Sequence, residues 1–105
     1  MAVAEILQEM KDNFNADAAD GMDLIFQFDI EDGDNHHMII KDGSCDVVAG
    51  DHDDPSVSLI MNKETLKGIT SGETDGMQAF MAGQLRAEGD MMLAMKLGEL
   101  FNIGA

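Results

Sequence analysis

The chain has few positive charges, one cysteine, and no tryptophan or tyrosine. Six lysines and arginines stand against 21 aspartates and glutamates, which gives a formal net charge of −15. Nucleic acids and anionic membranes are bound through cations that neutralise phosphates, so a surface of this charge repels both, and we expect no nucleic-acid partner. The single cysteine, Cys45, excludes an internal disulfide and a zinc site built from paired cysteines. It alternates with Val47 on a predicted strand, so we expect a small buried side chain rather than a reactive thiol.

Long apolar runs and the common catalytic motifs are also missing. No apolar segment approaches the ~20 residues that span a bilayer, so we expect no membrane-spanning helix. No basic region precedes the first apolar residues, so the pattern of a secretory signal is not present either. The last residues carry no peroxisomal or retention tripeptide, so we expect a cytoplasmic protein. A nucleophile elbow, a phosphate-binding glycine loop and a dinucleotide fingerprint are all absent. We therefore expect neither enzymatic activity nor a cofactor.

Length and charge balance set the class of protein. With 105 residues, 45% of them apolar, the sequence predicts one globular domain over residues 1–105. The acidic groups repel one another at low ionic strength, and salt screens this repulsion. We interpret the excess of acidic residues as adaptation to a high-salt cytoplasm. An ordinary acidic domain is the alternative.

In the first half of the chain, the spacing of the apolar residues changes from the period of a helix to the period of two that is typical of a strand. Apolar residues between Val3 and Phe14 recur at the spacing of one helix face, which predicts an amphipathic helix there. From residue 23 to residue 30 the apolar side chains alternate, so Gln27 is expected on the solvent face of a strand. Turn signals at residues 32–35 and 42–43 then predict two further strands, at 36–41 and 44–49, in an antiparallel meander.

The second half predicts shorter strands and capped helices. Alternation at 57–61 predicts a fourth strand, and Asn62 is a good first residue for a helix that ends near Gly72. Asp75 can cap the next helix, and Asp90 can cap the last one, which continues to residue 101. Between these two helices, alternation at residues 84–88 predicts a short fifth strand.

Two groups of residues resemble metal ligands. His36 and His37 are adjacent on a predicted strand, so their side chains point to opposite faces and cannot share a metal. The acidic stretch at residues 51–54 lacks the glycine-containing spacing of a calcium loop, and the following Pro55 fits turn chemistry. We expect no metal site.

Methionine is abundant, with ten in the chain, and it is concentrated between Met77 and Met95. Methionine is flexible and fills irregular spaces, so it suits both an ordinary core and a cavity whose contents vary in shape. The last predicted helix is apolar on more than one face and must be covered by protein or close over something else. Residue pattern alone leaves the core and the cavity as alternatives.

A resemblance to a known family favours the cavity. The resemblance covers nearly the whole chain and is carried by several short motifs that occur in the family's order and spacing. They are Phe26-Gln27-Phe28-Asp29-Ile30, Ile40-Lys41-Asp42-Gly43, Asp53-Asp54-Pro55 before Val57-Ser58-Leu59, residues 79–85, residues 89–91 and residues 94–97. Together they resemble the sterol carrier protein type 2 lipid-transfer domain.

The resemblance implies an α+β fold in which helices cover one face of a five-stranded mixed β-sheet and enclose an apolar tunnel. It also implies a non-catalytic carrier of fatty acyl, isoprenoid or sterol-like ligands. The alternative is an accessory module that presents such a substrate to a partner enzyme, with transient membrane or enzyme contact. Unlike eukaryotic members, the chain lacks a lysine-rich surface, which disfavours sterol as the ligand. The predicted tunnel wall consists of Phe26, Phe28, Leu59, Met77, Phe80, Met81, Leu85, Met92 and Met95.

Overall fold

Within residues 2–101, helices and strands follow the predicted order. The computed structural model describes these residues, apart from the side chains of residues 91 and 97–99. The ends of the predicted domain, residue 1 and residues 102–105, lie outside the described residues. In chain order the elements are α1 (Val3–Asp12), β1 (Asp23–Ile30), β2 (His36–Lys41), β3 (Ser44–Ala49), β4 (Val57–Met61), α2 (Lys63–Ser71), α3 (Gly76–Met81), β5 (Arg86–Gly89) and α4 (Met91–Phe101).

The strands form one mixed sheet in the order β3-β2-β1-β4-β5. The hairpins β1–β2 and β2–β3 are antiparallel, as the turn signals predict. Asp42 and Gly43 have φ angles of 54° and 74°, the two positive values that a tight hairpin turn requires. After this meander the chain returns to place β4 parallel to β1, and β5 then pairs antiparallel with β4. The predicted five-stranded mixed sheet is confirmed.

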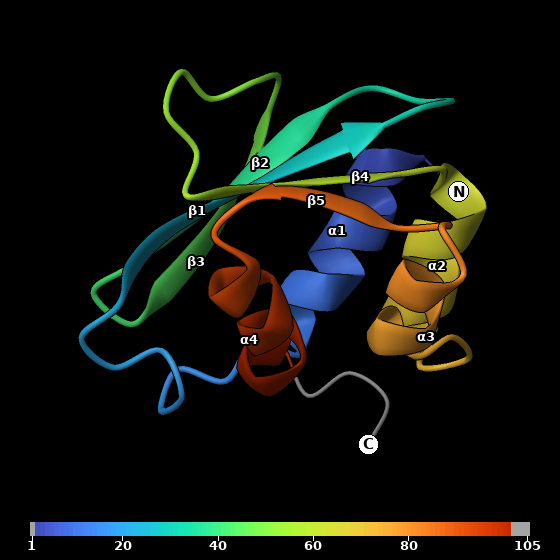
Figure 1. Cartoon of the computed structure of the whole chain (residues 1–105). Coiled ribbons are helices and arrows are strands. Elements are labelled where there is room, and N and C mark those ends of the chain that lie inside the picture. The colour runs from blue at the N-terminus through green and yellow to red at the C-terminus, as the bar shows by residue number, and fades with distance from the viewer. Residues whose placement is uncertain (1, 102–105) are drawn as a thin grey trace.

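All four described helices lie on one face of the sheet (Figure 1). Alternate side chains of the strands point toward them and are buried, which follows from the period of two in a strand. The buried side chains of the strands and those of the helices pack together in a single apolar core. The buried apolar residues of the three inner strands are Phe26, Phe28, Ile30, Met38, Ile40, Val57, Leu59 and Met61.

The opposite face of β1 is not the solvent face that the sequence predicts. Gln27 is only 3% exposed, because it contacts residues 51 and 52 of the segment between β3 and β4. This segment lies on the side of the sheet away from the helices (Figure 1). The backbone N–H of His52 donates to Gln27 Oε1 at 2.9 Å, and Gln27 Nε2 donates to Asp51 Oδ1 at 2.9 Å. The expectation for Gln27 is therefore wrong, since alternation in one strand carries no information about a distant loop.

The predicted helix caps are confirmed. The backbone N–H of Thr65 donates to Asn62 Oδ1 at 2.8 Å at the start of α2. Asp75 and Asp90 accept equivalent bonds from residues 77 and 92, both at 3.0 Å. These side chains satisfy backbone N–H groups that have no partner inside a helix, so they fix where α2, α3 and α4 begin.

Two contacts hold the end of α4 against the segment that follows α1. The rings of Phe14 and Phe101 are 5.6 Å apart, and the backbone N–H of Asn15 donates to the carbonyl of Leu100 at 2.6 Å. The predicted helix included Phe14, but α1 ends at Asp12 and Phe14 packs on α4 instead.

Among residues 2–101, no helix combines the length and apolar character needed to cross a membrane.

Candidate functional site

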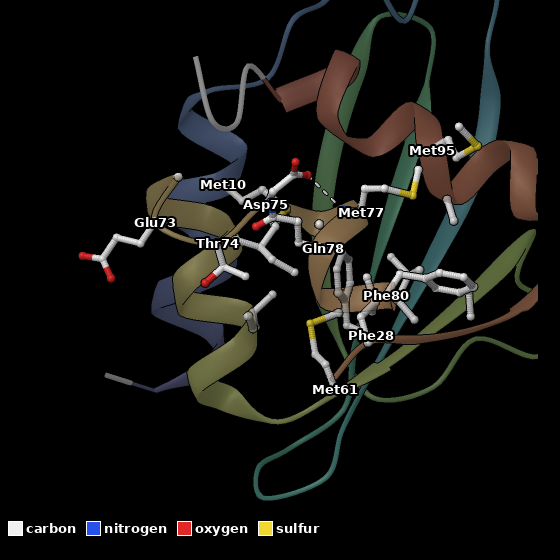
Figure 2. A pocket seen from close by; sticks show the side chains of 18 residues that line it. Met10, Phe28, Met61, Glu73, Thr74, Asp75, Met77, Gln78, Phe80 and Met95 are labelled. Atoms are coloured by element: carbon white, nitrogen blue, oxygen red, sulfur yellow. Dashed lines mark hydrogen bonds between the residues drawn. The ribbon is translucent and has the colours of Figure 1, made fainter. Parts of the chain in front are cut away.

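A cavity of about 550 Å³ lies between the sheet and the helices. This volume falls within the range of about 300–1,000 Å³ that is typical of small-molecule sites. Figure 2 shows its lining from close by, with side chains from the helices facing those of the sheet. Met77, Phe80 and Met95 line the cavity and are 46%, 39% and 61% exposed, so it opens to solvent. The enclosed tunnel implied by the resemblance stays a prediction.

The floor of the cavity comes from three neighbouring strands. Phe28 pairs in register with Leu59, and Leu59 pairs with Ala87, so these residues form one row across β1, β4 and β5. Met61 lies two residues beyond Leu59 on the same face of β4 and extends the floor. Phe28, Leu59 and Met61 are almost completely buried, so the floor is apolar and shielded from water.

The walls come from helices on different sides of the floor. Leu66 and Ile69 are one helical turn apart on α2, where both are buried. Met77 and Phe80 from α3 and Met95 from α4 complete the wall and remain partly exposed. The more exposed part of the cavity is thus lined by flexible methionines, which can adapt to ligands of different shapes.

One end of the cavity is polar and is built by the segment between α2 and α3. The backbone N–H of Thr74 donates to the carbonyl of Gly68 at 3.0 Å, so this segment folds back on α2. A Cβ at Gly68 would lie 2.5 Å from Thr74 Oγ1, so the close approach depends on glycine at this position. The polar residues that line the cavity are Glu73, Thr74, Asp75 and Gln78.

Six of the nine residues predicted for the tunnel wall come together at this cavity. They are Phe28, Leu59, Met77, Phe80, Leu85 and Met95. Phe26 lies on the same face of β1 as Phe28 but is enclosed in the core, opposite Met38 and Val57. Met81 and Met92 are 80% and 67% exposed and do not line the cavity. Lipid contact by any of these residues stays a prediction.

The sequence analysis did not identify several lining residues. Met61 and Ala87 have the inward parity of Leu59 on their strands, and Leu66 and Ile69 form the apolar stripe of α2, so the pattern could have indicated them. The polar end had no such signal, because residues 73–75 form an irregular segment whose position depends on its contact with α2.

The described residues show no arrangement for catalysis by a thiol or for metal binding. Cys45 is buried, and burial raises the pKa of its thiol to about 11, so it stays protonated at neutral pH. Nδ1 of His36 and Nδ1 of His37 are within hydrogen-bond distance of the carbonyls of Asp34 and Gly50. Among residues 2–101, no group of three or more histidines, cysteines and carboxylates is arranged to hold a metal ion.

A curated relative resembles this chain over almost all of its length. Hydroxysteroid dehydrogenase-like protein 2 of Bos taurus is 30% identical over 104 residues, which cover 96% of this chain. The same match covers 25% of the bovine protein, so the chain spans about a quarter of that relative's length.

Solved structures share the fold, and a family model assigns the chain. The sec-alkylsulfatase Pisa1 from Pseudomonas sp. matches with a TM-score of 0.79 and 20% identity, over 88% of this chain and 15% of the sulfatase. Palmitated SCP2L2 from Aedes aegypti matches with a TM-score of 0.71 and 23% identity, over 96% and 95% of the two chains. The model of the SCP-2 sterol transfer family matches residues 3–102. The chain therefore belongs to the SCP-2 sterol transfer family.

Proposed function

We propose that this protein is a non-catalytic intracellular carrier and that residues 1–105 act as one lipid-binding domain. Its ligand is an apolar lipid with a fatty acyl, isoprenoid or sterol-like chain. The observation that carries the proposal is the cavity of about 550 Å³ with a buried apolar floor at Phe28, Leu59 and Met61. Membership of the SCP-2 sterol transfer family supports it, as does the palmitate in the related mosquito structure.

The chemistry of the lining favours holding a ligand over transforming it. Apolar side chains gain free energy when they exclude water from a lipid chain, at roughly 25 cal/mol for each Å² removed from water. A burial of about 400 Å² would then contribute on the order of 10 kcal/mol before the costs of ordering are subtracted. The polar residues at one end, Glu73, Thr74, Asp75 and Gln78, include no histidine, lysine or cysteine. A lining of this kind stabilises a bound chain without supplying a nucleophile with its partner base.

A displacement titration tests the proposal. The protein has no tryptophan whose fluorescence could report binding, so an external dye is needed. Nile red is uncharged and fluoresces in apolar surroundings, so its fluorescence reports occupation of the cavity. Hexadecanol, farnesol and cholesterol would then compete with the dye at micromolar concentration. We expect displacement by at least one straight-chain or isoprenoid lipid, with cholesterol weakest. A protein that binds neither the dye nor any of these lipids would refute the carrier function.

A second candidate function is presentation of the lipid to a partner enzyme. Met81 and Met92, on α3 and α4, are 80% and 67% exposed, and exposed apolar side chains near a binding site suit protein contact. The matched region forms only a quarter of the bovine relative and 15% of the sulfatase chain, so related domains occur within larger proteins. Co-purification of a lipid-metabolising enzyme that is lost in a Met81→Glu/Met92→Glu variant would favour this function. The single-site control is Gln8→Glu, on the exposed face of α1.

A further inference from the structure

The polar lining of the cavity comes from one short segment of the chain. Residues 73–75 and Gln78 supply all of its polar side chains, and every other described lining residue is apolar or glycine. In Figure 2, Glu73, Thr74 and Asp75 lie on one side of the cavity, while Phe28 and Phe80 lie on the other. A lipid with one polar end is bound most favourably when its chain covers the apolar floor and its head group reaches the polar segment.

The charge at this end has one sign. Glu73 and Asp75 are carboxylates, and the described lining contains no lysine, arginine or histidine. The carboxylate of Asp75 is held in place because Oδ1 accepts the backbone N–H of Met77 at 3.0 Å (Figure 2). Glu73 extends away from the cavity in the same view, so solvent screens its charge more strongly. Asp75 is therefore the negative charge whose position at the polar end is fixed by a hydrogen bond.

A carboxylate head group at this position would meet a like charge without a counter-ion. Two unit charges about 6 Å apart at a solvated protein surface repel strongly enough to lower affinity by about threefold at low salt. A hydroxyl or amide head group carries no such cost and can donate a hydrogen bond to Asp75 or to the carbonyl oxygen of Gln78. The difference between the two kinds of ligand is then set by residues 73–78, while their alkyl chains contribute equally.

We propose that the cavity selects amphiphiles with an uncharged head group, such as long-chain alcohols, over free fatty acids, and that the head group lies against residues 73–78. This inference rests on the proposed carrier function and adds the chemical class of ligand.

Variants that change the charge at this end separate head-group selection from general affinity for apolar chains. Asp75→Asn removes the charge but keeps a side chain that caps α3 well. Gln78→Lys places a cation at the cavity. The matched controls make the same changes on exposed residues that do not line the cavity, Asp42→Asn in the β2–β3 turn and Gln8→Lys on α1. Dissociation constants for palmitate and hexadecanol would be measured by Nile red displacement at pH 8, at 50 mM and 1 M NaCl.

Palmitate affinity is expected to rise about threefold in Asp75→Asn and about tenfold in Gln78→Lys at 50 mM NaCl. Both gains should shrink at 1 M NaCl, where charges are screened over about 3 Å. Hexadecanol carries no charge, so its affinity should rise in neither variant, and neither control should change palmitate affinity more than twofold. If palmitate affinity moves no further in these variants than in the controls, the head-group inference is overturned while the carrier function stands. If the wild type binds neither lipid, the carrier function falls and the inference falls with it.

Discussion

Gln27 Nε2 and Asp51 Oδ1 are 2.9 Å apart, and this hydrogen bond joins the central strand of the sheet to the segment before β4. The same amide nitrogen donates to Asp29 Oδ1 at 3.2 Å, and Oε1 accepts the backbone N–H of His52 at 2.9 Å. A side chain that is 3% exposed is thus satisfied by three partners. Because β4 carries the cavity floor, the position of this segment helps to fix where β4 begins.

Gln27→Ala should destabilise the fold. The substitution removes the three hydrogen bonds of a buried side chain. At about 1 kcal/mol for each bond, the cost is about 3 kcal/mol in the free energy of unfolding. Urea denaturation followed by circular dichroism measures this change. Gln8→Ala, at an exposed position of α1, should change stability by less than about 0.5 kcal/mol. A loss below 1 kcal/mol in Gln27→Ala would mean that the segment at residues 50–55 is not held by this side chain.

Burial of Cys45 predicts a loss of stability at alkaline pH. Its pKa is raised from 9.0 to about 11 by burial, so the unfolded thiol loses its proton at lower pH than the folded thiol. The folded state then binds more protons between these values, and stability falls as pH rises through this window. At pH 11 the loss relative to pH 8 is about 2 kcal/mol. The chain has no tyrosine, which would otherwise titrate in the same range.

The Cys45→Ala variant isolates this contribution. All other side chains are common to the two proteins, so the difference in unfolding free energy between wild type and variant is the quantity to follow from pH 8 to pH 11. We expect wild type to lose about 2 kcal/mol more than the variant over this range. Parallel pH profiles would show that the thiol is not buried in solution.

The net charge of −15 predicts a strong dependence of stability on salt. Charges are screened over about 10 Å at 0.1 M salt and about 3 Å at 1 M, so dilution exposes the carboxylates to mutual repulsion. We expect the melting temperature to fall by roughly 5–10 °C from 2 M to 0.1 M KCl, which corresponds to ~1–2 kcal/mol in a domain of this size. Sucrose at matched osmolality is the control for effects other than charge. A melting temperature that does not respond to KCl would contradict adaptation to high salt.

Filling the cavity should abolish lipid binding without unfolding the protein. Ala94 lines the cavity from α4 and is half-buried, so Ala94→Phe places a ring in the space of the ligand. Lipid affinity should fall at least tenfold, while the melting temperature stays equal or rises because apolar surface is covered. Ala4→Phe makes the same change on the exposed face of α1 and should leave affinity unchanged. Equal affinity in the two variants would mean that lipid binds elsewhere.

The sequence predicted the order and bounds of the elements well because local patterns determine them. Hydrophobic period located the strands, and the side chains of Asn62, Asp75 and Asp90 marked the helix starts. Errors occurred at element ends and in residues that depend on distant contacts. Phe14 lies beyond α1, and Leu85, predicted on the fifth strand, precedes β5 and bonds by its backbone N–H to the carbonyl of Ala79 at 3.1 Å.

The cavity was less predictable than the fold, because apolar character does not show whether a side chain lines the cavity or packs in the closed core. Phe26 and Phe28 have the same parity on β1, yet Phe28 lines the cavity and Phe26 is enclosed in the core. On the helices, Met77 reaches the cavity while Met81, one turn later, is 80% exposed. The polar end formed by residues 73–75 depends on the contact of Thr74 with Gly68, which no local pattern encodes.

Native mass spectrometry of protein purified without detergent tests the carrier function most directly. A cavity of about 550 Å³ with an apolar floor predicts one lipid per chain, released on activation as a single long-chain species and identified by extraction. The Ala94→Phe variant, prepared in parallel, should appear at the mass of the protein alone. Wild-type protein that carries no lipid, and takes none up when incubated with hexadecanol or farnesol, would contradict the account.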